Sequence, residues 1–64
     1  MDGEPELADL RAQSDHASHR LALYRRRVYV GRADAGRLPE YERIARGAAD
    51  RLRRAEARER RSTP

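Results

Sequence analysis

The chain has 64 residues, of which 41% are charged and 38% are hydrophobic, and it carries a formal net charge of +4. A chain of this length forms one small domain at most, with a core that is marginal unless the chain associates with another. The sequence has no cysteine, which excludes a disulfide scaffold and cysteine-ligated zinc or iron–sulfur centres. Without Phe or Trp, an aromatic-rich sandwich or barrel is also disfavoured.

The distribution of apolar and charged residues indicates the cellular location of the protein and the charge of its partners. No apolar run approaches the roughly 20 residues that a membrane span needs, and the acidic start lacks the basic and apolar regions of a signal peptide. We therefore expect a cytoplasmic protein that does not bind membranes. All 15 basic residues are arginine. Residues 20–37 hold six arginines and one acid, whereas residues 1–15 hold five acids and one arginine, and this basic block favours anionic partners.

Two stretches rich in helix-forming residues carry the three–four spacing of a coiled-coil seam. The first seam comprises Leu7, Leu10, Ser14, Ala17, Leu21, Tyr24 and Val28. The second comprises Leu38, Tyr41, Ala45, Ala48, Leu52 and Ala55, with Ile44 beside it. The pattern predicts an all-α fold, an antiparallel two-helix hairpin of the coiled-coil type, as a single domain over residues 1–64. We expect the first helix over about 5–34, a turn at about 35–38 and the second helix over about 39–61.

Glycine and proline indicate where the helices end and begin. Gly36 is predicted to stop the first helix, and Pro39 suits the first turn of the second, where its missing N–H is not needed. The small seam residues would bury little area, so a lone hairpin should be unstable. We therefore expect a homodimer that forms a four-helix bundle.

Some residues off the first seam do not suit a purely solvated face. His16, Leu23 and Val30 fall at heptad position c, and His19 and Arg26 at f. Leu23 and Val30 are either scattered surface residues or a second contact surface for a partner helix, a flat ligand or a second copy. The two histidines are three residues apart, a spacing that suits a metal, but no evident carboxylate completes a ligand set. Surface histidines are the simpler interpretation, and no metal site is predicted.

The run Arg25-Arg26-Arg27 lies between Tyr24 and Tyr29, and such residues can contact phosphates and stack on bases. No DNA-binding motif accompanies the run, however, and acids alternate with arginines in the second stretch. The pairs Glu42–Arg46, Asp50–Arg54 and Glu56–Arg60 have the order of a self-paired, solvated face. Direct DNA binding is therefore not favoured. Because no catalytic triad or phosphate-binding glycine loop is evident, we expect neither an enzyme nor a cofactor.

Residues 23–34, Leu-Tyr-Arg-Arg-Arg-Val-Tyr-Val-Gly-Arg-Ala-Asp, resemble the ligand-binding helix of the actinobacterial RsiG anti-sigma factors. That family is an antiparallel helical hairpin that binds cyclic di-GMP and, with it, a WhiG-type sigma factor. Its motif falls on His19, Leu23, Arg26, Val30 and Asp34. Arg26 and Asp34 match the motif, whereas the other three positions replace an acid, a hydroxyl and an amide. The second stretch shows no second copy of the motif, so the resemblance implies a composite site made by two first helices in a dimer.

The chemistry of these residues suits that ligand. An arginine such as Arg26 can donate a fork to guanine O6 and N7, and a carboxylate such as Asp34 can accept from the guanine N–H groups. On one continuous helix the two residues would lie roughly 12 Å apart, with Gly31 in mid-helix. Apolar contact to the bases would come from Leu23 and Val30. The remaining candidates are His19, at the acid position, and the phosphate-neutralising arginines Arg25, Arg27 and Arg32.

Three functions follow as hypotheses. The leading one is a small signalling protein that binds cyclic di-GMP through the first helix, with a WhiG-type sigma factor as a candidate partner. The alternative is a structural helical hairpin that contacts other proteins and binds no nucleotide. The third is an arginine-rich accessory to nucleic acid.

Overall fold

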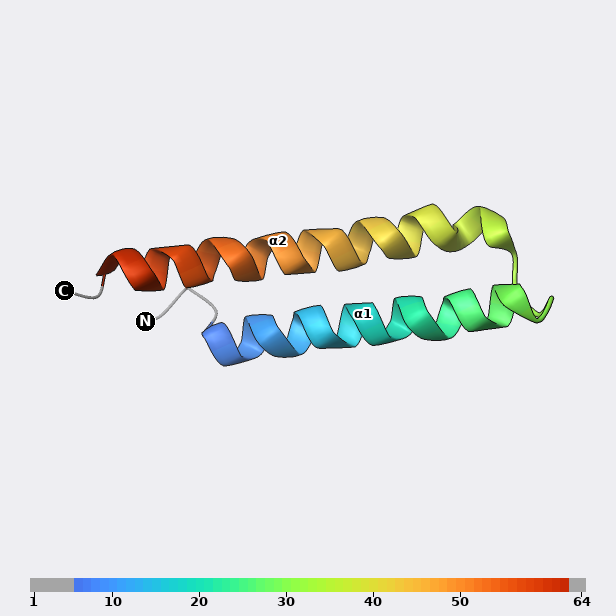
Figure 1. Cartoon of the computed structure of the whole chain (residues 1–64), viewed down its shortest axis with the longest axis horizontal. Coiled ribbons are helices and arrows are strands. Elements are labelled where there is room, and N and C mark those ends of the chain that lie inside the picture. Colours follow the sequence, from blue (N-terminus) through green and yellow to red (C-terminus); the bar gives the residue numbers. More distant parts are fainter. Residues whose placement is uncertain (1–5, 63–64) are drawn as a thin grey trace.

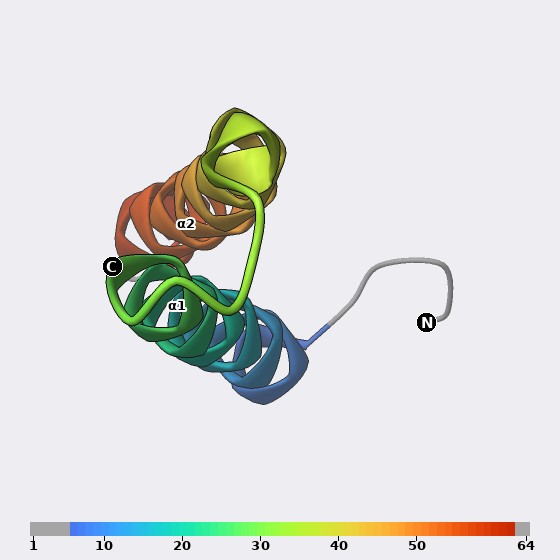
Figure 2. The ribbon, with the colours of Figure 1, turned by 90° about the vertical axis from the view of Figure 1, so that its right-hand side faces the viewer.

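The computed structural model describes residues 6–62, and two long helices run antiparallel through them (Figure 1). Helix α1 spans Leu7–Tyr29, a short 3₁₀ helix η1 spans Ala35–Arg37, and helix α2 spans Leu38–Ser62. No strand occurs within this described range. Viewed from the connecting loop, α1 and α2 lie side by side and pack on each other (Figure 2). The predicted all-α hairpin is confirmed.

The seam between the helices is the one that the heptad spacing predicts. Every predicted seam residue is buried or half-buried. The most buried are Leu10, Ala17, Tyr24, Ala45 and Ala48, each 8% exposed or less. The three alanines form a cluster, and Leu21 packs against it. Small residues at the centre of the seam let the backbones approach closely, but they bury little apolar area.

Helix α1 ends earlier than the sequence predicts, and Gly31 is the reason. Gly31 adopts a φ of +78°, a left-handed conformation that glycine reaches without strain. Its N–H donates to the Val28 carbonyl oxygen at 3.0 Å, and the Arg32 N–H donates to that of Arg27 at 2.7 Å. This pair of bonds is the Schellman arrangement that closes a helix C-terminus. The predictions that α1 continues to residue 34, with Gly31 inside it and Gly36 as its stop, were therefore wrong.

The segment between the helices is held by Asp34 and Tyr24. The Asp34 carboxylate accepts a hydrogen bond of 2.9 Å from the Gly36 N–H and so caps η1. The Tyr24 hydroxyl donates to the Asp34 backbone oxygen at 2.7 Å, which ties the segment to α1. The connection begins at Val30, several residues before the predicted turn at 35–38. Helix α2 begins and ends within one residue of its predicted bounds, with Pro39 in its first turn.

Candidate ligand-binding groove

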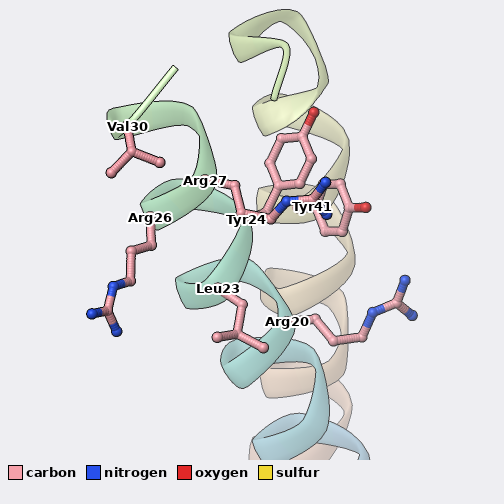
Figure 3. Close-up of a pocket in the computed structure, with 7 residues that line it drawn as sticks. All are labelled: Arg20, Leu23, Tyr24, Arg26, Arg27, Val30 and Tyr41. Atoms are coloured by element: carbon pink, nitrogen blue, oxygen red, sulfur yellow. The ribbon is translucent and has the colours of Figure 1, made fainter. Parts of the chain in front are cut away.

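Two adjoining grooves lie along one side of the hairpin and share Arg20 and Tyr41. The larger, here the Arg26 groove, has a volume of about 490 Å³. Its lining residues, drawn in Figure 3, are Arg20, Leu23, Tyr24, Arg26, Arg27, Val30 and Tyr41. The smaller, here the Ile44 groove, has a volume of about 190 Å³ and is lined by Gln13, His16, Ala17, Arg20, Tyr41, Ile44, Ala48 and Arg51. None of these lining residues is acidic, so both grooves attract anionic groups.

The Tyr24 and Tyr41 rings, one from each helix, give the Arg26 groove an aromatic wall. The rings are stacked, with centroids 4.3 Å apart and planes 16° from parallel. The Arg20 guanidinium carbon lies 5.8 Å from the centroid of the Tyr41 ring, a cation–π distance. Because Tyr24 is also fixed by its hydroxyl, this wall is ordered before any ligand arrives.

The rim of the Arg26 groove is exposed and partly apolar. Leu23 is 48% exposed and Val30 is 60% exposed. Arg26 extends from α1 on the side away from Tyr41, beside Val30, whereas Arg20 extends past Tyr41 (Figure 3). Within residues 6–62, no acid pairs with Arg20, Arg26 or Arg27. Their guanidinium groups are therefore available to a bound anion.

The structure brings together four of the eight site residues that the sequence predicts. Leu23, Arg26, Arg27 and Val30 all line the Arg26 groove. Sequence reasoning considered Tyr24 only for stacking on the bases of nucleic acid, and it missed the contribution of Arg20 and Tyr41 to the groove. A signal was present, because Tyr24 and Tyr41 are the only aromatic seam residues and occupy the same heptad position in facing helices.

The other four predicted residues lie elsewhere. Arg25 pairs with Glu42 across the helices at 3.3 Å, and His19 and Arg32 are exposed and line neither groove. Asp34 lies beyond the end of α1, so it does not share a helix with Arg26 as predicted. Since its carboxylate caps η1, the predicted role of Asp34 as a guanine acceptor on the same continuous helix as Arg26 does not follow from this geometry.

The opposite edge of the interface carries ion pairs between the two helices. Arg11 lies 3.8 Å from Glu56, and Arg25 lies 3.3 Å from Glu42, measured between guanidinium nitrogen and carboxylate oxygen. Each of these four residues directly follows a seam residue in the sequence. A second set directly precedes seam residues and consists of Arg20, Arg27, Ile44 and Arg51. The two sets therefore flank the seam on opposite sides. We call the first set the paired edge and the side with the two grooves the open edge.

The ion pairs differ from those that the sequence predicts within α2. Glu42 and Glu56 pair with arginines of α1 instead of Arg46 and Arg60, and Asp50 pairs with Arg53 instead of Arg54. Glu42 and Glu56 lie directly beside the seam, where they reach the facing helix.

Comparisons with protein-family models, curated proteins and solved structures found no match to this chain. The described part of the chain has no group of three His, Cys, Asp or Glu residues that could hold a metal ion. Neither α1 nor α2 combines the length and apolar character needed to cross a membrane. The open edge therefore has to be interpreted from its own geometry and charge.

Proposed function

We propose that this chain is a small signalling protein that binds the second messenger cyclic di-GMP in the Arg26 groove. The observation that carries the proposal is that three arginines, Arg20, Arg26 and Arg27, line a groove with an exposed apolar rim and no acid among its lining residues. A cyclic dinucleotide offers the complementary chemistry, two phosphates and two planar bases. The groove volume of about 490 Å³ lies within the range of small-molecule sites.

The arginines can recognise both parts of such a ligand, its phosphates and its bases. A guanidinium presents a planar fork that matches a phosphate or the O6 and N7 edge of guanine. Adenine carries an amino group in place of O6, so the same fork favours guanine over adenine. Leu23 and Val30 offer apolar contact to a base face beside Arg26. In this proposal guanine selectivity comes from arginine and does not depend on Asp34.

The proposal extends to a homodimer and a regulatory partner. A single open groove covers one face of a flat ligand, so two copies would share it, each contributing one α1. The ligand phosphates between the two arginine sets would offset their mutual repulsion. The resemblance of residues 23–34 to the RsiG family supports an anti-sigma role, with a WhiG-type sigma factor as the partner.

Calorimetric titration with cyclic di-GMP, cyclic di-AMP and GTP tests the proposal. We expect micromolar or tighter binding of cyclic di-GMP and weaker binding of the other two. Arg26→Ala removes a charge-assisted fork and should weaken binding by about 1–3 kcal/mol, roughly 5- to 150-fold. Asp34→Asn should leave the affinity close to that of the wild type, because the carboxylate caps η1.

Arg25→Ala is the matched control, since it removes the same charge from the neighbouring residue on the paired edge. It should reduce affinity only through general electrostatics, an effect that added salt diminishes. Equal losses for the Arg25 and Arg26 variants would mean that bulk charge holds the ligand. Absence of cyclic di-GMP binding by the wild type at micromolar concentrations would refute the proposal.

A further inference from the structure

The Ile44 groove extends the open edge beyond the proposed nucleotide site. Its floor includes Ala17 and Ala48, whose small side chains leave a hollow between the helices. Ile44 lies at the rim and is 56% exposed. Leu23 and Val30, on the rim of the adjoining groove, are exposed to a similar extent. The open edge therefore presents separate apolar side chains along a shallow channel.

The channel formed by the two grooves is long enough to hold a helix of several turns. Along α1 its lining residues run from Gln13 to the C-cap residue Val30, which corresponds to roughly 26 Å at about 1.5 Å per residue. A third helix of about 18 residues would match that length. Laying the apolar face of a helix into such a channel is a recurrent mode of recognition between proteins.

The positive charge of the channel indicates that the docked helix carries acidic residues on both sides of its apolar stripe. Arg20 and Arg27 lie on α1 and Arg51 on α2, and no lining residue of either groove is acidic. A second copy offers the wrong complement, because a two-fold interface would set these arginines against themselves. The acids Glu42 and Glu56 are already paired with arginines on the other edge. Nucleic acid would satisfy the arginines, but its phosphate backbone would give Leu23, Val30 and Ile44 no apolar contact.

We propose that the open edge docks an amphipathic helix of another protein, with an apolar stripe flanked by Asp and Glu, to form a three-helix bundle. The apolar stripe packs on the channel floor and on Ile44, Leu23 and Val30. The acidic flanks pair with Arg20, Arg27 and Arg51. The docking surface overlaps the proposed nucleotide site at Leu23, Val30 and the two arginines of α1. Ile44 and Arg51 line only the Ile44 groove, so variants at these two residues test the docking apart from nucleotide binding.

A labelled synthetic peptide tests the proposal by fluorescence anisotropy with the full chain. The peptide has about three heptads, with Leu at positions a and d and Glu at e and g. Its companion carries Lys in place of every Glu. We expect micromolar binding of the Glu peptide and at least about tenfold weaker binding of the Lys peptide. No binding of the Glu peptide at about 100 μM, or equal binding of both, overturns the proposal.

Matched variants locate the binding on the channel. Arg51→Glu should weaken binding of the Glu peptide by about tenfold, because an attractive contact becomes repulsive. Arg54→Glu makes the same charge change outside both grooves and should have a much smaller effect. Ile44→Ser should weaken binding about fivefold through lost apolar contact, whereas Tyr29→Ser, at a residue 90% exposed and outside both grooves, should not. Equal effects within either pair contradict docking on this channel.

Two further measurements test whether a second copy or nucleic acid occupies the open edge instead. Circular dichroism verifies that each variant stays helical. If sedimentation shows a ligand-free dimer that Arg51→Glu dissociates, a second copy occupies the edge and the proposal fails. If a DNA duplex displaces the Glu peptide and itself loses affinity on Arg51→Glu, the edge binds nucleic acid and the proposal fails. Unchanged cyclic di-GMP affinity in the Arg51 variant would distinguish this docking surface from the nucleotide site.

Discussion

The paired edge and the open edge flank the same seam, yet within the described residues arginines form ion pairs across the helices only on the paired edge. On the paired edge, Arg11 and Arg25 each meet a glutamate of α2. On the open edge, Arg20 and Arg51 share a groove with Ile44, and no acid lines it. The difference shows that the position of an arginine around the helix, and not the local density of arginines, decides its role.

The run Arg25-Arg26-Arg27 makes this point within three consecutive residues. Successive residues on an α-helix are rotated by about 100°, so the three side chains leave α1 in three directions. Arg25 reaches Glu42 on the paired edge, whereas Arg26 and Arg27 line the Arg26 groove. A basic run that looks uniform in sequence thus contains one arginine that links the two helices and two that line a groove.

The largest effect is expected at Tyr24, which joins the seam to the open edge. Tyr24→Ala removes the stacked ring and the hydroxyl that holds the Asp34 backbone oxygen. We expect it to reduce the free energy of unfolding by about 3–5 kcal/mol, the range for truncating a buried aromatic residue. Thermal and urea unfolding followed by circular dichroism would measure the loss, which approaches the whole stability of so small a fold.

Tyr24→Phe is the matched variant, since it keeps the ring and removes only the hydroxyl. It should cost about 1 kcal/mol, the typical net value of one hydrogen bond. If the Ala and Phe variants lost the same stability, the hydroxyl contact with Asp34 would matter and the ring stacking would not. A loss below about 1 kcal/mol for Tyr24→Ala would contradict the packing of the seam.

The fold was predictable because the seam is a periodic signal. Successive seam residues are three or four apart from Leu7 to Val28 and again from Leu38 to Ala55, and each helix buries its stripe. The end of α1 depends instead on a single backbone conformation. Both Gly31 and Gly36 suit a helix stop in composition, and nothing in the periodicity distinguishes them. Only the hydrogen bonds of Gly31 and Arg32 show which glycine closes the helix.

The candidate site was only half predictable for a related reason. Leu23 and Arg26 lie on α1 and Val30 is its C-cap residue, so their shared face follows from spacing alone. Tyr41 comes from the other helix, and its place depends on the register between the two. Asp34 was misplaced because α1 was predicted to continue past Gly31, and this error is confined to the few residues between Gly31 and η1.

An intermediate effect is expected from reversing one charge on the paired edge. Glu42→Arg replaces the contact with Arg25 by a like-charge pair. Because both side chains are partly exposed, we expect a loss in the free energy of unfolding of about 1 kcal/mol or less. Urea unfolding at low and high salt would measure it, and about 1 M salt should remove most of the loss through screening.

The double variant Arg25→Glu with Glu42→Arg restores opposite charges and is the control for that pair. It should recover most of the stability that the single reversal loses. Failure to recover would show that the Arg25–Glu42 contact does not stabilise the paired edge.

The smallest effect on the isolated chain is expected at Ile44, where the open edge can be converted toward the paired edge. Ile44→Glu places a carboxylate in the groove that Arg20 lines, while the exposed isoleucine loses little apolar burial. We expect the free energy of unfolding to change by no more than about 0.5 kcal/mol. Ile44→Arg should be less stable than Ile44→Glu, because it adds a like charge beside Arg20. Loss of more than about 2 kcal/mol in both variants would mean that Ile44 is buried in solution, against another copy of the chain. The same Ile44→Glu change should repel the acidic peptide, so the variant would keep its stability and lose its docking, as an open edge that serves recognition requires.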